Sequence, residues 1–298
     1  MTVTTATDRA AQSRPHYAID VEDVEYLWHD GKPLLARLFK PRGDGPFPIM
    51  VDLHGGAWCN GDRMNDALIN EALAKSGVLV AALDFRMPPQ AGYPASIGDI
   101  NYAVRWLKSE AVGLKARPDR VGMIGISSGG HQAMLSAMRP ADSRYAALPL
   151  GKGQQYDARV GCVVLCWPVI DPLGRYRYAK RVLAQGGKYP EVLNRVVPLH
   201  DQYWGSEEAM QEGSPVAALE KGESVEMPPV LYAQGADDMV HPRADLDRFV
   251  AAYRKRGGSV ELALYEGEVD GFIIRNAASP RAKAGLERII AFVHEKLA

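Results

Sequence analysis

A series of short apolar runs, each separated from the next by a longer amphipathic segment, sets the strongest limit on the fold. The runs are bounded by Gly or Pro, and nearly every position in them is apolar, rather than every second one. Strands of that kind are buried on both faces, as in a parallel sheet that helices cover on its two sides. The predicted strands are 49–53, 78–83, 121–126, 160–166, 230–234 and 260–265. The sequence therefore predicts an α/β fold with a mostly parallel sheet.

The segments between these runs have the periodicity of amphipathic helices. In 243–256, for example, Leu246, Phe249 and Tyr253 fall on one helical face, and the pattern stops at a Gly pair. Further helices are predicted at 65–75, 97–108, 128–138 and from 280 to the C-terminus. Residues 21–41 form a hairpin instead, because Asp30-Gly31 supplies the positive φ angles that a tight turn needs. An antiparallel start thus precedes the alternating strands and helices.

The order of these elements favours one domain at 21–298, preceded by a flexible N-terminal arm at 1–20. The first residues lack an apolar core segment, so we expect a loose arm rather than a secretory signal. One stretch, about 171–229, contains no predicted strand but several aromatic residues and repeated Gly and Pro. An insertion of this length between two strands of a sheet is more often a functional cap than a structureless loop.

Composition excludes several classes of protein. Hydrophobic residues make up 47% of the 298 residues, and 35 Lys and Arg balance 36 Asp and Glu. These values argue against disorder and against a basic nucleic-acid-binding face, and no apolar run reaches the ~20 residues of a membrane span. The three cysteines match neither a disulfide framework nor a zinc site. We expect reduced thiols, a cytoplasmic location, no metal and no cofactor.

The segment Gly125-Ile-Ser127-Ser128-Gly129-Gly130 lies where a predicted strand becomes a helix. In a G-x-S-x-G elbow, flanking glycines permit a sharp turn that lifts the serine above the sheet. A bare match to this pattern is common by chance, but the strand before it and the helix after it are the expected context. Ser127 is therefore the candidate nucleophile.

A second motif, His54-Gly55-Gly56-Ala57-Trp58, follows the strand 49–53. Glycines at a strand end let successive backbone N–H groups converge on one point, as a developing oxyanion requires. The alternative is an ordinary Gly-rich turn. With the serine elbow downstream, we predict an oxyanion hole formed by the N–H groups of Gly56, Ala57 and Ser128.

Together these motifs resemble the α/β-hydrolase fold and, within it, the esterases that carry a His-Gly-Gly motif. This group includes hormone-sensitive-lipase-like carboxylesterases, feruloyl esterases and kynurenine formamidases. The likeness runs from about residue 21 to the C-terminus, and Trp58 in the fifth place of the motif is typical of one branch. His131, just after the elbow, is by this resemblance a structural histidine.

The resemblance also implies a Ser, Asp, His order for the catalytic triad. The strand 230–234 leads into a loop in which Asp238 matches the family's acid, with Asp237 as the adjacent alternative. The acid would orient the histidine and stabilise its cation. The histidine itself normally lies in a His-Gly-Phe turn after the next strand, but that turn here reads Asp270-Gly271-Phe272. An aspartate there would be a weak base, about 2.6 pKa units below histidine.

Three explanations of Asp270 remain open. It replaces the histidine of an active parent, in which case this chain is impaired. Alternatively, another histidine serves as the base, and His241, His200 and His294 are the candidates. Lastly, the protein has given up hydrolysis for binding or a non-hydrolytic reaction, as the plant gibberellin receptors of similar fold did.

We therefore expect a serine carboxylesterase, impaired by Asp270, that acts on a small to mid-sized, partly apolar ester. An N-formyl or other amide hydrolase, and a ligand-binding protein on the same scaffold, are the alternatives. The predicted substrate-binding residues are Trp58, Tyr203, Trp204 and Phe272. We expect no nucleic-acid or membrane partner, and the strand 260–265 would allow a homodimer if it lies at the sheet edge.

Overall fold

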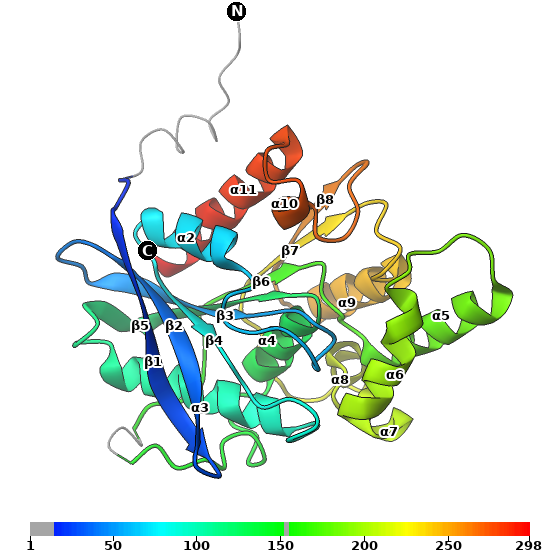
Figure 1. Cartoon of the computed structure of the whole chain (residues 1–298), viewed down its shortest axis with the longest axis horizontal. Helices are drawn as coiled ribbons and strands as arrows, with labels where there is room; N and C mark the ends of the chain where they lie inside the picture. Colours follow the sequence, from blue (N-terminus) through cyan, green and yellow to red (C-terminus); the bar gives the residue numbers. More distant parts are fainter. Residues whose placement is uncertain (1–14, 152–154) are drawn as a thin grey trace, which may run out of the picture.

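The computed structural model describes residues 15–151 and 155–298. Its centre is one eight-stranded sheet with the order β1-β2-β4-β3-β5-β6-β7-β8 (Figure 1). Strands β1 and β2 pair antiparallel, β2 joins β4 antiparallel, and every later pair is parallel. The strands are β1 (Ile19–His29), β2 (Lys32–Pro41), β3 (Phe47–Leu53), β4 (Leu79–Leu83), β5 (Ala116–Ile126), β6 (Val163–Cys166), β7 (Val230–Gly235) and β8 (Val260–Tyr265). The mostly parallel α/β sheet predicted from the sequence is confirmed.

The antiparallel start is the predicted hairpin, with Asp30 and Gly31 both at positive φ in its turn. The first strand begins at Ile19, earlier than predicted. Just before it, the backbone N–H of Tyr17 donates to the carbonyl of Lys75 at 2.8 Å, and its ring packs edge-on against Phe47. The end of the predicted arm is thus held against the domain, whereas residues 1–14 lie outside the described residues.

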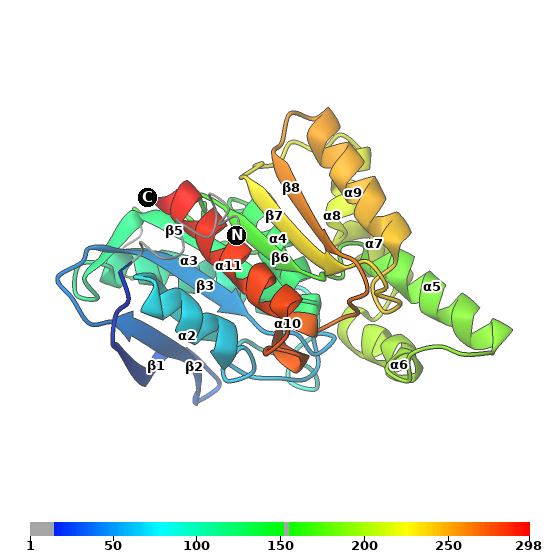
Figure 2. The ribbon, with the colours of Figure 1, turned by 90° about the horizontal axis from the view of Figure 1, so that it is seen from above.

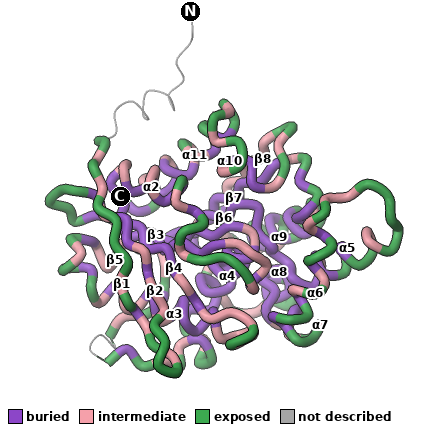
Figure 3. Tube along the Cα trace, in the orientation of Figure 1, coloured by how far each residue is buried: buried purple, intermediate pink, exposed green. Residues whose placement is uncertain are grey.

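The central strands are buried on both faces, as their continuous apolar sequence requires. In β4, Leu79, Ala81 and Leu83 enter the core cluster on one face. Val80 and Ala82 enter the cluster on the other face. The tube in Figure 3 shows the same arrangement, since buried residues run through the central strands and exposed ones lie along β1 and in loops. Two separate hydrophobic cores therefore pack against the two faces of one sheet.

Helices cover both faces of the sheet (Figure 2). Helices α2 and α11 supply apolar residues to one core, and helices α3, α4, α8 (Pro215–Glu220) and α9 supply apolar residues to the other. Their bounds are α2 (Ala67–Lys75), α3 (Ala95–Glu110), α4 (Ser128–Met138), α9 (Arg243–Lys255), α10 (Phe272–Arg275) and α11 (Pro280–Leu297). α11 begins as predicted, because the hydroxyl of Ser279 accepts from the N–H of Ala282 and Pro280 occupies the first turn.

The stretch between β6 and β7 is helical. It contains α5 (Pro172–Gln185), α6 (Leu193–Trp204), α7 (Glu207–Glu212) and α8 (Pro215–Glu220). Helices α5, α6 and α7 lie together at one end of the molecule, beyond the carboxyl ends of the parallel strands (Figures 1 and 2). Two of these helices begin at serine caps, Ser206 and Ser214, whose hydroxyls accept from backbone N–H groups.

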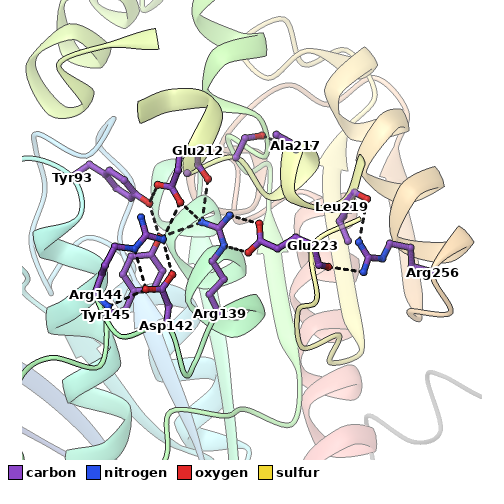
Figure 4. Close-up of polar contacts among 12 residues, drawn as sticks. Tyr93, Arg139, Asp142, Arg144, Tyr145, Glu212, Ala217, Leu219, Glu223 and Arg256 are labelled. Carbon is purple, nitrogen blue, oxygen red and sulfur yellow. Dashed lines mark hydrogen bonds and ion pairs between the residues drawn. The ribbon is translucent and has the colours of Figure 1, made fainter. Parts of the chain in front are cut away.

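Arg139, at the C-terminal end of α4, ties this helical stretch to the sheet domain (Figure 4). Its guanidinium makes two hydrogen bonds of 2.7 Å to the carboxylate of Glu223 and one of 2.8 Å to Glu212. Glu212 also accepts from Arg144 and from the hydroxyl of Tyr93. Because charge-assisted hydrogen bonds are stronger than neutral ones, this cluster fixes α7 and the loop after α8 against α4.

Among the described residues, no helix is long and apolar enough to cross a membrane. The three cysteines are free thiols. Within residues 15–151 and 155–298, strand β8 pairs with β7 alone and lies at the sheet edge, the position that a strand-paired homodimer would use. That dimer stays a prediction.

Candidate active site

Ser127 occupies a strained turn between β5 and α4, with φ 53° and ψ −114°. The flanking glycines are required sterically. A Cβ on Gly125 would overlap the backbone of Gly129, and a Cβ on Gly129 would overlap the carbonyl of Leu53. A non-Gly residue at positive φ inside an elbow is typical of an exposed nucleophile held above a sheet. The local sequence thus dictates the position of Ser127.

His241 is the hydrogen-bonding partner of Ser127. The Oγ of Ser127 lies 3.0 Å from Nε2 of His241, and Nδ1 of His241 lies 2.8 Å from Oδ2 of Asp238. Since the ionised carboxylate only accepts, Nδ1–H donates to it, which leaves Nε2 to accept the serine proton. The three side chains form a continuous chain from hydroxyl to imidazole to carboxylate.

The strand order brings these residues together. β5, β6 and β7 are parallel neighbours in register, so the elbow after Ile126 and the loop after Gly235 open on the same edge of the sheet. The other oxygen of Asp238 accepts from the N–H groups of Val240 and His241 at 2.7 and 3.0 Å. These hydrogen bonds hold the loop in a turn in which the imidazole of His241 reaches Ser127.

The environment of Asp238 favours its ionised form. Burial alone would raise its pKa, but the attraction of His241 and the hydrogen bonds from His241 and Val240 outweigh burial, and the pKa is lowered. An ionised, buried carboxylate stabilises a neighbouring imidazolium. Asp237, the adjacent alternative from the sequence, has no side-chain contact with His241 among the described residues.

The expectation that Asp270 stands in place of the base needs correction. Asp270 lines the same cavity, but its carboxylate pairs with Arg275 at 3.2 Å and makes no hydrogen bond to Ser127 or His241. The physical reason is that an imidazole three residues after Asp238 already reaches the serine. His241 was among the alternative bases considered from the sequence, but only the packed strands show that it reaches Oγ.

The other histidines lie elsewhere. His294 meets the hydroxyl of Ser76 at 3.0 Å, in the region of α2 and α11. His200 is buried, and Nδ1–H donates to the carbonyl of Val196 within α6. His131 accepts from Nε1 of Trp58 at 3.1 Å and donates to the carbonyl of Gly213 at 2.8 Å. His131 thus links the loop after β3 to the helical stretch, which is a structural role.

The loop after β3 places free backbone donors beside Ser127. Gly56 has φ 120°, and a Cβ there would overlap the carbonyl of Asn60. Ala57 is also at positive φ. Within the described chain, the N–H groups of Gly56, Ala57 and Ser128 donate to no backbone or side-chain acceptor. Gly56 and Ala57 line the cavity, so their N–H groups are available to a bound oxyanion.

A cavity of about 600 Å³ opens onto Ser127 and His241. Its apolar walls come from the elbow, from α6 and from the loops after β6, β7 and β8, and comprise Ile126, Trp167, Val192, Val196, Leu199, Val240 and Ile274. Polar and charged side chains also reach it, namely Asn60, Asn65, Asp66, Arg175, Arg195, Asp270 and Arg275. A small to mid-sized organic molecule fits such a space.

The aromatic residues expected to bind substrate do not line this cavity. Trp58 stacks on Tyr203, Trp204 packs edge-on against both in a buried cluster, and Trp58 is only 1% exposed. Phe272 is buried between Trp167 and Tyr265. Their large apolar surfaces pack the helical stretch onto the domain and do not face a substrate. The prediction for these four residues was wrong.

Sequence reasoning missed the charged residues of the cavity other than Asp270, and two of them, Arg175 and Asp66, are buried. Arg175 belongs to α5, and Asp66 directly precedes α2. Burial, followed by the charge of Asp52, raises the pKa of Asp66 well above its ordinary range, which favours its neutral form. Neither residue lies in a recognisable motif, so no signal in the sequence separates it from surface Asp or Arg.

Comparisons with known proteins identify the family and the fold of this chain. The BD-FAE family model matches residues 38–251. Esterase LipC of Mycobacterium tuberculosis is 27% identical over 225 residues, which cover 73% of this chain and 52% of that protein. Ethyl acetate hydrolase of Pseudomonas putida is 32% identical over 133 residues, 43% of this chain and 42% of that protein. The chain spans about half the length of the curated relatives it matches.

Solved esterase structures share the fold. EstE1, a carboxylesterase cloned from a metagenomic library, superposes with a TM-score of 0.75 at 21% identity, with full coverage of both chains. Esterase Est2 of Thermogutta terrifontis, with propionate bound, superposes with a TM-score of 0.71 at 22% identity, covering 92% of this chain and 94% of that one. The sheet order and the serine elbow are those of the α/β-hydrolase fold, and the chain belongs to the BD-FAE family.

Proposed function

We propose that this protein is a serine hydrolase that cleaves a carboxylic ester through an acyl-enzyme on Ser127. The observation that carries the proposal is the chain of hydrogen bonds from Ser127 to His241 to Asp238, at 3.0 and 2.8 Å, with Ser127 and His241 at the wall of a cavity. The esterase names of the relatives support the same reaction class. The substrate must fit the cavity of about 600 Å³.

In the proposed reaction, Oγ of Ser127 attacks the ester carbonyl while Nε2 of His241 takes the hydroxyl proton. Asp238 stabilises the imidazolium that forms. The negative oxygen of the tetrahedral intermediate accepts from the N–H groups of Gly56, Ala57 and Ser128, and each such donor contributes about 2.7–4 kcal/mol in other hydrolases. His241 then returns the proton to the leaving alcohol as the C–O bond breaks. Water, activated by the same imidazole, releases the acid.

This assignment removes the reason to expect an impaired enzyme. The expectation of low turnover rested on Asp270 as the base, and the contact between His241 and Ser127 supports a competent one. The alternative of a binding protein on a hydrolase scaffold rested on the same missing base. Amide hydrolysis uses the same catalytic residues, so an assay with both esters and amides must distinguish the two substrate classes.

Labelling with a fluorescent phosphonate, followed by hydrolysis of a panel of aryl esters and formamides, tests the proposal. We expect labelling of the unmodified chain at Ser127 and none of Ser127→Ala. The variant His241→Ala should keep its fold, checked by circular dichroism, but label at least 100-fold more slowly. An unmodified chain that neither reacts with the phosphonate nor cleaves any ester or amide would contradict the proposal and favour the binding protein.

A further inference from the structure

Arg175 is a buried cation in the candidate active-site cavity. Arg175 lies in the first turn of α5, is only 3% exposed and lines the cavity. Its Nε and Nη1 atoms are buried and have no hydrogen-bond partner among the described residues, and no ion pair of its guanidinium is found there. Buried polar groups are normally satisfied, so this side chain calls for an explanation.

The surroundings keep Arg175 charged without pairing it. Burial lowers its pKa to about 10, and the more distant carboxylates of Asp238, Asp270 and Asp245 act against that shift. At neutral pH the guanidinium is therefore protonated. These three acids have other partners, since Asp238 accepts from His241, Asp270 pairs with Arg275 and Asp245 lies 3.7 Å from the guanidinium of Arg248. The buried imidazole of His200 offers no charge, because burial and then Arg175 lower its pKa to about 3.

The rest of the cavity adds positive rather than negative charge. Asp270 and Arg275 offset one another, and burial favours the neutral form of Asp66. Arg195, exposed at the cavity wall, has no ion pair among the described residues. Arg175 thus provides uncompensated positive charge in a space whose other walls are largely apolar.

We propose that Arg175 binds a carboxylate group of the substrate, so that the ester cleaved at Ser127 carries a free carboxylate in its acyl or alcohol part. This inference rests on the proposed function and narrows its substrate class. A guanidinium N–H donates a charge-assisted hydrogen bond to a carboxylate oxygen, which is stronger than a hydrogen bond between neutral groups. The apolar walls between Arg175 and Ser127 would then hold the short carbon chain that separates the carboxylate from the scissile bond.

Matched pairs of esters test the inference. In one pair the carboxylate is on the acyl side, with mono-4-nitrophenyl glutarate compared with 4-nitrophenyl valerate. In the second pair it is on the alcohol side, with 3-acetoxybenzoate compared with phenyl acetate. We expect kcat/KM of the unmodified chain to favour the carboxylate-bearing member by at least tenfold in one pair, after subtraction of spontaneous hydrolysis. Arg175→Met should reduce that preference by about 10- to 100-fold.

The ratio within a pair separates recognition from an indirect effect. If Arg175 acted only through the field at Asp238, Arg175→Met would slow both members equally and leave the ratio unchanged, which would overturn the inference. Arg175→Lys should recover part of the preference, because it restores charge without the guanidinium. Arg177→Met is the matched control, since Arg177 lies on the same helix, its side chain is 62% exposed and it pairs with Glu207.

Two further measurements do not depend on hydrolysis. Arg175→Met should melt at the same temperature or higher than the unmodified chain, because a buried cation without a partner destabilises the fold. A structural role would instead lower the melting temperature. Calorimetry with glutarate should detect binding to Ser127→Ala and at least tenfold weaker binding to the double variant with Arg175→Met. Equal affinity for both would refute the inference, even if no ester proves to be a substrate.

Discussion

The Nδ1 atom of His241 lies 2.8 Å from Oδ2 of Asp238, a residue only three positions earlier in the chain. One short loop after β7 therefore supplies both the carboxylate and the imidazole, while the loop after β8 supplies Asp270 to the cavity wall. The chain order Ser, Asp, His is kept. The two backbone N–H groups that donate to Asp238 make the pair a rigid unit.

His241→Ala should lower kcat by about 10⁴-fold or more, because Ser127 then loses its proton acceptor. Steady-state hydrolysis of an activated aryl ester measures the effect. His294→Gln is the control, since His294 meets Ser76 and lies outside the cavity. Equal losses in the two variants would show that damage to the fold, not loss of the base, lowers the rate.

Asp270→His, the change that restores the family pattern, should raise kcat/KM by less than about threefold. His241 already occupies the hydrogen-bonding position at Ser127, and Asp270 faces Arg275. The same ester assay measures both chains side by side. A gain of about 100-fold or more, of the size that a general base provides, would instead return the role of base to position 270.

Gly56→Ala should lower kcat by about 10²-fold or more. A Cβ at this position would overlap the carbonyl of Asn60, and φ 120° is strained for alanine, so the loop must move and its N–H groups turn away. Gly31→Ala is a suitable control, because Gly31 also has positive φ but a Cβ there meets nothing. A change in KM with kcat unaltered would contradict the role of this loop in binding the oxyanion.

The contribution of Asp52 to stability should fall as the pH rises from about 4 to 7. Burial raises the pKa of this carboxyl to about 7, against ~3.9 in the unfolded chain, and its hydrogen bond from Asn70 only partly opposes burial. In this window the folded protein keeps a proton that the unfolded chain releases, so the free energy of unfolding decreases with pH.

Asp52→Asn removes this titration, so a rise from pH 5 to pH 8 should change its free energy of unfolding less negatively than that of the unmodified chain. Urea unfolding of both chains at the two pH values measures the effect, and we expect the two pH-dependent changes to differ by on the order of 3 kcal/mol. A variant whose stability changes with pH as steeply as that of the unmodified chain would contradict the assignment to Asp52.

Arg139→Met should lower the free energy of unfolding by about 2 kcal/mol, since it leaves Glu212 and Glu223 without their buried partner. Denaturant unfolding gives the value, and kcat/KM at 25 °C should change little. Arg144→Met removes only more exposed ion pairs and should cost less than about 1 kcal/mol. Similar costs for both variants would argue against an anchoring role of Arg139.

Local patterns predicted much of the fold. Continuous apolar runs identified the parallel strands, and Asp30-Gly31 located the hairpin turn. The glycines around Ser127 identified the elbow, because their need for a small residue arises from backbone contacts close by. The aromatic residues were predicted wrongly, since a Trp or Tyr in an irregular segment fits a core and a binding site equally well in sequence. Only packing against Trp58 assigns Tyr203 and Trp204 to the core.

The sequence by itself determined the sheet, the elbow that exposes Ser127 and the Gly-rich loop beside it, because each depends on local backbone preferences and short-range sterics. Tertiary structure alone decided that His241 rather than Asp270 meets Ser127, and that Arg175 enters the cavity with no ion pair among the described residues. These choices depend on which loops the parallel strands bring to one sheet edge and on where α5 packs. Such long-range contacts produce no periodic pattern in the sequence.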